Sequence, residues 1–339
     1  MPTVGQIHID QALTNLSLMY RNEMYVADMA LPILPVSKRS DKYFVYKKED
    51  FLSPSASGAS GLPGSVRRPG TEAAEIDYSL STQSFYAEEY AYRGFVADAE
   101  VSVADNPLQP DIDQSLQLAE RLMLDNETAV AKLTGTRAQY PGSNKAALTT
   151  GATGTSWASY ASPNSNPFSD IKNGKLAVVK GIAREANAML LSVDAARTLA
   201  DHPVVKDLIK YTNQDALTMS GLPKVIRGLE VIEGAAQKNV SPEGGSYAGG
   251  NVWAADDGSA MALIFYRTTT PSLRGVSFGY TFEAPDDTTG SRGMTVRRWR
   301  EEKRKGSLIE ASFLRDWKLI AQDGAGLSLG GYLLSNVTA

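Results

Sequence analysis

The stretch PDIDQSLQLAERLMLDNETAVAKLTG, residues 110–135, carries a long helical pattern in this 339-residue chain. Its apolar residues recur at three- and four-residue steps, as on one side of a helix: Ile112, Leu116, Ala119, Met123, Val130 and Leu133. Asp111 or Asp113 can cap the first turn, and Gly135 can end the helix. We therefore expect a helix over residues 111–134, about 35 Å long at 1.5 Å per residue, that organises the fold.

Upstream of this helix, the sequence predicts a long β-hairpin. Residues 43–51 and 74–96 are rich in Tyr, Phe and Val, which favour strands. Between them, residues 53–70 (SPSASGASGLPGSVRRPG) are dominated by Ser, Gly and Pro and predict a flexible tip. A lone two-stranded ribbon is marginal in water, so the rest of the domain or an adjacent subunit must cover it. Residues 1–40 predict an arm with one short helix, packed on the main body or on a neighbour.

Downstream of the long helix, the patterns indicate a compact mixed region. Asn166 and Pro167 open a second helix, and residues 188–193 (AMLLSV) predict a short buried strand. Residues 193–213 predict two short helices broken at Pro203. Further strands are expected in residues 225–236, 261–267, 276–284, 294–302 and 307–321. No helix is evident after about residue 216, and we expect a chain of the α+β class.

Composition excludes several classes of protein. The chain has no cysteine, so disulfides, thiolate metal sites and cysteine nucleophiles are absent. A formal net charge of −4 argues against a dedicated nucleic-acid reader, which needs a basic surface. The first residues lack the pattern of a secretory signal, and no stretch approaches the length of a membrane span. We expect folding in a cytoplasm and no membrane partner.

No motif of an enzyme is present. His8 and His202 are the only imidazoles, and His202 is expected to cap or pack at a helix junction. The sequence has no metal-binding HExxH motif, no nucleophile elbow and no phosphate-binding loop. Neighbouring acids such as Asp256 and Asp257 are usually solvated turn residues. The sequence therefore predicts no catalytic residue, no cofactor and no metal site.

The most basic stretch, residues 292–305, has two interpretations. It can form a solvated hairpin, or an inter-subunit or DNA-facing ribbon. Trp299, which lies between arginines, suits a half-buried interface position. The candidate contact residues are Arg297, Arg298, Trp299 and Arg300.

The order of arm, hairpin, long helix, mixed region and returning strands resembles the HK97-type major capsid (coat) protein of tailed bacteriophages. The local similarity is best over residues 166–213, with the helix, the strand AMLLS, the helical AARTLADHP and the following VVKDLIKYTN. The resemblance covers nearly the whole chain but rests on pattern and order, without an invariant motif. It implies an HK97-like fold with an N-terminal arm, an extended β-hairpin loop, a long spine helix, and peripheral and axial domains.

The resemblance also implies a division of the chain. The expected parts are an arm at 1–42, an extended loop at 43–96 with its tip at 53–70, a peripheral domain at 97–187 with the spine helix at 111–134, an axial domain at 188–290, and returning strands at 291–339. The extended loop would lie over a neighbouring subunit, with Arg67 and Arg68 as its charged contacts.

By the same resemblance, the chain is a structural subunit that forms hexamers and pentamers of an icosahedral head around double-stranded DNA. The implied location is the virion, after assembly in the host cytoplasm. Only some forty residues precede the extended loop, where related proteins often begin with a scaffolding segment, so a separate scaffolding protein is expected. A portal protein and a cement or decoration protein are further expected partners.

Three alternatives stay open at this stage. An encapsulin-like nanocompartment shell shares the architecture but encloses cargo enzymes, and particle size and contents would separate the two. A phage tail or baseplate protein suits the spine helix and long hairpin less well. A hydrolase with a mixed α and β core is disfavoured by the near absence of histidine and by the lack of a nucleophile motif.

Overall fold

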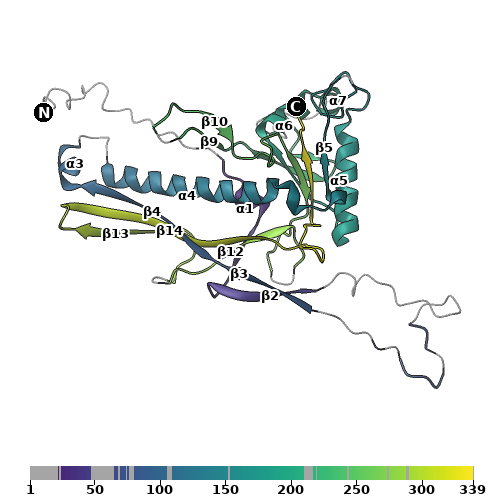
Figure 1. Ribbon diagram of the computed structural model, residues 1–339, viewed down its shortest axis with the longest axis horizontal. Coiled ribbons are helices and arrows are strands. Elements are labelled where there is room, and N and C mark those ends of the chain that lie inside the picture. Colours follow the sequence, from purple (N-terminus) through teal and green to yellow (C-terminus); the bar gives the residue numbers. More distant parts are fainter. Residues whose placement is uncertain are drawn as a thin grey trace.

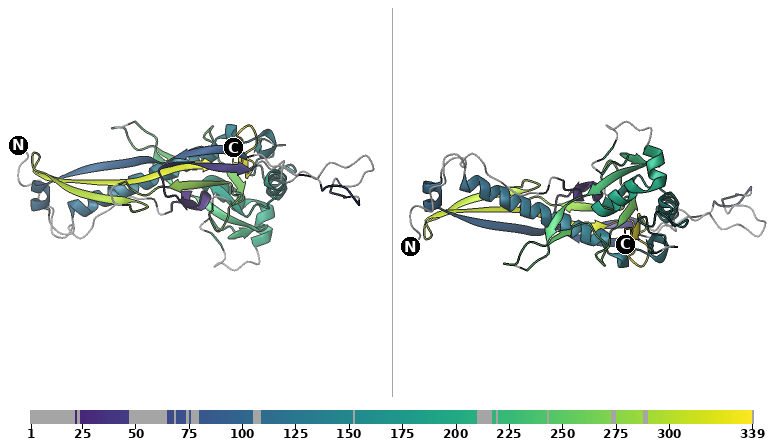
Figure 2. Two further views of the ribbon diagram at one scale, coloured as in Figure 1. Left: turned by 90° about the horizontal axis from the view of Figure 1, so that it is seen from below. Right: turned by 90° about the horizontal axis from the view of Figure 1, so that it is seen from above.

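The structure is a computed structural model of an elongated subunit that contains two large β-sheets (Figure 1). It describes residues 22, 24–46, 65–67, 69–73, 75, 80–104, 109–151, 153–209, 217–218, 220–242, 244–272, 275–287 and 290–338. A long helix and long strands run side by side along one half (Figure 2). The other half is the compact mixed region (Figures 1 and 2). None of the helices in these ranges has both the length and the apolar character needed to cross a bilayer.

The spine helix α4 spans Pro110–Gly135, which confirms the expected helix and its end at Gly135. Its start differs slightly from the prediction, because Gln109 is the N-cap and Pro110 takes the first helical position. Neither acid is therefore the N-cap residue. Asp113 instead reaches back from the first turn, and its Oδ2 accepts the Gln109 N–H at 3.2 Å.

A five-stranded sheet runs under the spine helix. The 14-residue strand β14 (Gly306–Leu319) is its centre, and it contains no Gly or Pro after its first residue to interrupt the pairing. One side of β14 pairs with β4 (Glu88–Ala97), and the other pairs first with β13 (Thr295–Glu301) and then with β12 (Gly279–Glu283). The short strand β1 (Ile33–Pro35) adds in parallel to β12. Leu118 and Leu122 of α4 pack on this sheet among Val96, Ile309, Ala311 and Phe313.

A six-stranded sheet forms the compact half. Its strands, in spatial order, are β5 (Lys145–Ala147), β15 (Gly331–Ser335), β11 (Ala262–Phe265), β6 (Ala188–Ser192), β8 (Leu229–Gly234) and β7 (Val225–Ile226). The central strands AMLLS and ALIF are buried throughout because both faces are covered. One face contacts helices α5 (Pro167–Ile182) and α6 (Val193–Asp201), and the other contacts the end of α4 and the arm.

Local start and stop signals in the compact half act as the sequence predicts. The Asn166 side chain caps α5 by accepting the Ser169 N–H at 3.2 Å, and Pro167 takes the first turn. Pro203 opens α7 (Pro203–Ile209) directly after α6, so the expected break is confirmed. The ring of His202 lies between the two helices, and its Nδ1 accepts the Val204 N–H at 3.3 Å.

The hairpin and the arm complete the fold. Strands β2 (Ser40–Tyr46) and β3 (Leu80–Tyr86) pair antiparallel from Ser40 with Tyr86 to Tyr46 with Leu80. The short arm helix α1 (Ala27–Ala30) packs into the main core, which confirms contact between the arm and the body. The remaining elements are α3 (Asp98–Val103), η2 (Arg137–Gln139), η3 (Gly142–Asn144), β9 (Gln237–Asn239) and β10 (Gly249–Asn251).

The domain division at 97–187, 188–290 and 291–339 stays a prediction. The two sheets themselves do not follow these sequence boundaries. Strand β5 belongs to the six-stranded sheet and helix α5 packs on it, whereas β12 belongs to the five-stranded sheet. Each half is therefore assembled from separate stretches of the chain.

Candidate inter-subunit surfaces and the joint behind them

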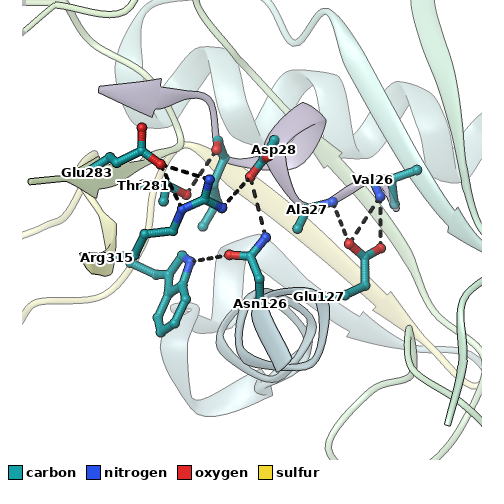
Figure 3. Close-up of polar contacts among 10 residues, drawn as sticks. Val26, Ala27, Asp28, Asn126, Glu127, Thr281, Glu283 and Arg315 are labelled. Atoms are coloured by element: carbon teal, nitrogen blue, oxygen red, sulfur yellow. Dashed lines mark hydrogen bonds and ion pairs between the residues drawn. The ribbon is translucent and has the colours of Figure 1, made fainter. Parts of the chain in front are cut away.

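A buried carboxylate joins the arm to the spine helix (Figure 3) and also binds Trp253 of the compact half. Glu127 of α4 is fully buried, and its Oε2 accepts the Ala27 N–H at 2.8 Å. Its Oε1 accepts the Val26 N–H at 2.9 Å and the indole N–H of Trp253 at 2.6 Å. These donors satisfy the carboxylate where water is excluded, and they fix the arm against the helix.

Arg315 of β14 extends this set of polar contacts to the five-stranded sheet (Figure 3). Its guanidinium is mostly buried and donates to Glu283 Oε1 from Nη2 at 2.9 Å. Its Nη1 reaches Asp28 Oδ1 of the arm at 3.3 Å. Asn126 of α4 donates to the same Asp28 oxygen at 3.4 Å and accepts the indole N–H of Trp317 at 3.0 Å. One polar cluster thus ties the arm, α4, β12 and β14 together.

The sequence alone does not predict this cluster. One signal was available, because Glu127 stands between Met123 and Val130 at the spacing of the apolar residues. A charged residue at such a position needs buried partners. The partners themselves lie about 100 residues away in the arm and 126 residues away at Trp253, which local patterns do not reveal.

Burial also makes Glu127 sensitive to pH. Burial raises the pKa of the Glu127 carboxyl above its usual value, and its three hydrogen bonds offset this only in part. The folded chain therefore holds a proton on this group more tightly than the unfolded chain, so the group's contribution to stability grows as the pH falls through the raised pKa. We expect the free energy of unfolding of the wild type, minus that of Glu127→Gln, to be larger at pH 5 than at pH 7. Denaturant titrations at both pH values measure this difference in the free energy of unfolding. A smaller difference at pH 5 than at pH 7 would contradict the raised pKa of Glu127.

The arginines of the basic ribbon are engaged within the subunit. Arg297 pairs with Asp286, and its Nη1 lies 3.8 Å from Glu310. Arg298 pairs with Asp111 of the spine helix at 2.7 Å. Arg300 pairs with Asp98 at 2.9 Å and with Glu302 at 2.6 Å. Their charge is thus largely compensated, which weakens the DNA-facing interpretation of the ribbon.

Trp299 lies on the same strand but differs from its neighbours. Its side chain is 41% exposed, and Val296 on the same strand is also exposed. Among the described strands, β13 pairs only with β14, so its outer edge is open. An open edge with an exposed Trp suits contact with another subunit, although charged side chains along an edge also prevent unwanted strand pairing. The interface role of Arg297, Arg298, Trp299 and Arg300 stays a prediction.

The long loop of the hairpin is exposed wherever the structure describes it. Every described residue between 65 and 75 is exposed, including Val66. The Arg67 guanidinium donates from Nε to the Thr71 carbonyl at 2.6 Å, which is a contact within the loop. Arg68, the second candidate contact, lies outside the described residues. The inter-subunit role of both arginines stays a prediction.

The base of the hairpin, in contrast, is firmly held. Phe85 stacks on Phe282 of β12 with ring centroids 4.5 Å apart, and Tyr43 packs on the same ring. Arg39 pairs with Asp287 at 2.6 Å. This arrangement holds the hairpin by its root and leaves the described part of its loop in solvent.

The structure places His202 in a packing role. Its ring is buried, lies edge-on to Tyr160, and has Nε2 3.4 Å from the Ser165 hydroxyl. That hydroxyl donates to the Ser156 carbonyl at 2.7 Å, so Ser165 is a structural donor here. The second histidine, His8, is outside the described residues. Within the described ranges, no three of His, Cys, Asp and Glu gather as metal ligands would.

Comparison of sequences identifies two phage relatives. No family model matches the chain. It is 24% identical over 286 residues to the major capsid protein of Pseudomonas phage JBD67, covering 84% of this chain and 85% of the relative. It is 26% identical over 229 residues to the major capsid protein of Burkholderia phage BcepMu, covering 67% and 69%.

Comparison of structures identifies the fold. A phage-related protein from Bordetella bronchiseptica superimposes with a TM-score of 0.65 at 22% identity, over 94% of both chains. A chain from the capsid of cyanophage P-SCSP1u gives a TM-score of 0.59 at 11% identity, over 94% and 90%. The SrpI encapsulin of Synechococcus elongatus gives 0.56 at 11% identity, over 96% and 94%. The fold is thus the HK97-like α+β fold expected from the order of elements.

Proposed function

We propose that this chain, which has the HK97-type fold, is the major capsid protein of a tailed bacteriophage. Its subunits assemble as hexamers and pentamers into an icosahedral head around double-stranded DNA. The observation that carries this proposal is the similarity to a phage major capsid protein over 84% of the chain, combined with the fold. The chain acts as a building element and not as an enzyme.

The shape of the subunit supports this role. A shell subunit needs wide contact with several neighbours instead of one pocket. Here β13 has an open edge among the described strands, and the described residues of the hairpin loop, around 65–75, lie beyond the body (Figure 1). A net charge of −4 is compatible with an enclosed genome, because like charge prevents the shell from gripping the DNA inside it.

Electron microscopy of particles tests the proposal. The chain is co-expressed with the neighbouring phage genes, and the assembled fraction is isolated by sedimentation. We expect closed icosahedral particles of phage-head size built from this chain. A protein that stays monomeric under every co-expression condition would contradict the proposal.

An encapsulin-like shell is the second candidate, because an encapsulin shares the fold. Both sequence relatives reported above are phage capsid proteins, which favours the phage head. The contents of purified particles separate the two functions. Double-stranded DNA in particles from infected cells supports the head, whereas a specific cargo enzyme supports the nanocompartment.

The further partners belong to the same proposal. A separate scaffolding protein directs assembly, a portal protein occupies one vertex, and a cement or decoration protein can bind outside. Assembly takes place in the host cytoplasm, and the chain ends in the virion. Efficient formation of uniform empty shells by this chain expressed alone would argue against the separate scaffolding protein.

The two loop arginines give a specific prediction. The variant Arg67→Glu with Arg68→Glu is expected to assemble several-fold more slowly at low salt, because reversed charge opposes an acidic partner surface. Its free energy of unfolding should change by less than about 0.5 kcal/mol, as for other surface positions. Light scattering follows assembly, and denaturant titration follows stability.

The matched control reverses charge at the root of the same hairpin. Lys38 and Lys42 are exposed there, so Lys38→Glu with Lys42→Glu introduces the same change in charge. If the control slows assembly as much as the loop variant, the arginines have no special role.

A further inference from the structure

One side of the spine helix is covered along half of its length and bare along the other half. Successive steps of three and four residues connect Ile112, Leu116, Ala119, Met123, Glu127, Val130 and Thr134 into one continuous row, here called the α4 ladder. The last three residues of the α4 ladder are fully buried. Ile112, Leu116 and Met123 are 52%, 47% and 45% exposed. The apolar stripe expected from the sequence is therefore buried only towards its C-terminal end.

The bare half is separate from the face that packs on the sheet. Leu118 and Leu122 make that contact, and they lie about 100° or more around the helix from Leu116 and Met123. The spine helix thus has two apolar faces. The described part of the subunit covers the first face fully and the second only in part.

The arm and the six-stranded sheet cover the second face where it is covered, and the arm does so at the boundary with the bare half. The Val26 and Ala27 N–H groups bind Glu127, and the Asn22 N–H binds Glu120 Oε1 at 3.0 Å. Between Ala27 and Asn22 the arm therefore moves back along α4 from Glu127 to Glu120. Asn22, the first residue that the structure describes, is therefore held about one turn of α4 from Leu116.

The preceding sequence is apolar in a matching way. Ala12, Leu13, Leu16, Met19 and Tyr20 fall at three- and four-residue spacing, so residues 12–20 can present one apolar face in helical form. The distances also fit. Leu116 lies about 6 Å before Glu120 along the helix, and the three steps from Asn22 back to Met19 span about 4.5 Å as a helix and about 10 Å when extended. Met19 is thus within reach of Leu116.

We propose that the bare half of the α4 ladder is the docking surface for residues 12–20 of the same chain. The same chain is the occupant because its arm is already anchored at Glu120, one turn away from Leu116. The arm of a second copy would have to displace this local segment. Docking extends the contact between the arm and the spine helix that Val26 and Ala27 make at Glu127. The proposal does not depend on the proposed capsid function.

Cysteine crosslinking tests the proposal, since the chain has no native cysteine. The full-length double variant Met19→Cys with Leu116→Cys is treated with a short bismaleimide. We expect a bridge within one chain, seen as a monomer band in denaturing gels and as a linked peptide pair by mass spectrometry. The matched control replaces Leu116→Cys by Gln117→Cys, which is exposed but points about 100° away around the helix. It should bridge several-fold less.

Each other outcome overturns the proposal. A link found only in dimer bands assigns the surface to the arm of a second copy. Equal bridging in the Gln117 control shows that the arm has no preferred face. Failure of the Leu116 pair to bridge shows that the surface is left to another partner.

Discussion

A chain in which Asn-Gly replaces residues 47–79 is expected to fold normally and to form no shells. Tyr46 and Leu80 are a register pair of β2 and β3, so a two-residue turn can join them directly. The described residues of the removed segment are exposed, and their loss should change the free energy of unfolding by less than about 1 kcal/mol. Assembly, however, should be abolished, because the loop is proposed to reach a neighbouring subunit. Denaturant titration and electron microscopy provide the two measurements.

A second variant separates the length of the loop from its side chains. It replaces residues 47–79 by a Gly/Ser segment of equal length, which keeps the reach but removes the specific contacts. We expect this variant also to fold and to fail in assembly. Shells of normal size from the Asn-Gly chain would show that the loop is dispensable and would contradict its inter-subunit role.

Glu127→Ala is expected to lower the free energy of unfolding by about 3–5 kcal/mol. The substitution leaves the Val26 and Ala27 N–H groups and the Trp253 indole without their buried acceptor, and each unsatisfied donor costs about 1–3 kcal/mol. Because two of these donors belong to the arm, we also expect faster proteolysis of the arm. Denaturant titration and limited proteolysis measure the two effects.

Asp125→Ala is the matched control for this prediction. Asp125 belongs to the same helix, but its carboxylate accepts an exposed hydrogen bond from the Tyr92 hydroxyl at 2.5 Å. Its removal should cost no more than about 1 kcal/mol. Equal losses in the two variants would mean that Glu127 is not a special anchor.

The elements that the sequence predicted share a local cause. The spine helix follows from the spacing of apolar residues over seven turns, and it ends at Gly135 as expected. The break between α6 and α7 follows from Pro203. The strand AMLLS is recognisable as a short apolar run that is buried on both faces. In each case, neighbouring residues contain the physical information.

The features that the sequence did not predict depend on distant partners. Burial of the α4 ladder changes at Glu127 because the arm and the six-stranded sheet, both distant in the sequence, cover only its C-terminal half. The ribbon arginines are compensated by acids from other elements, such as Asp111 for Arg298 and Asp98 for Arg300. Pairing of β1 with β12 joins residues nearly 250 positions apart. The local spacing of apolar residues does not show which distant residues pair with each other.

The most direct test of the central claim is an icosahedral reconstruction by electron cryomicroscopy of particles assembled from this chain. The account predicts a closed shell of hexamers and pentamers, with the loop around residues 65–75 lying on a neighbouring subunit. A shell in which this loop contacts only its own subunit would contradict the proposed role of the loop. Absence of any icosahedral particle would contradict the proposed function itself.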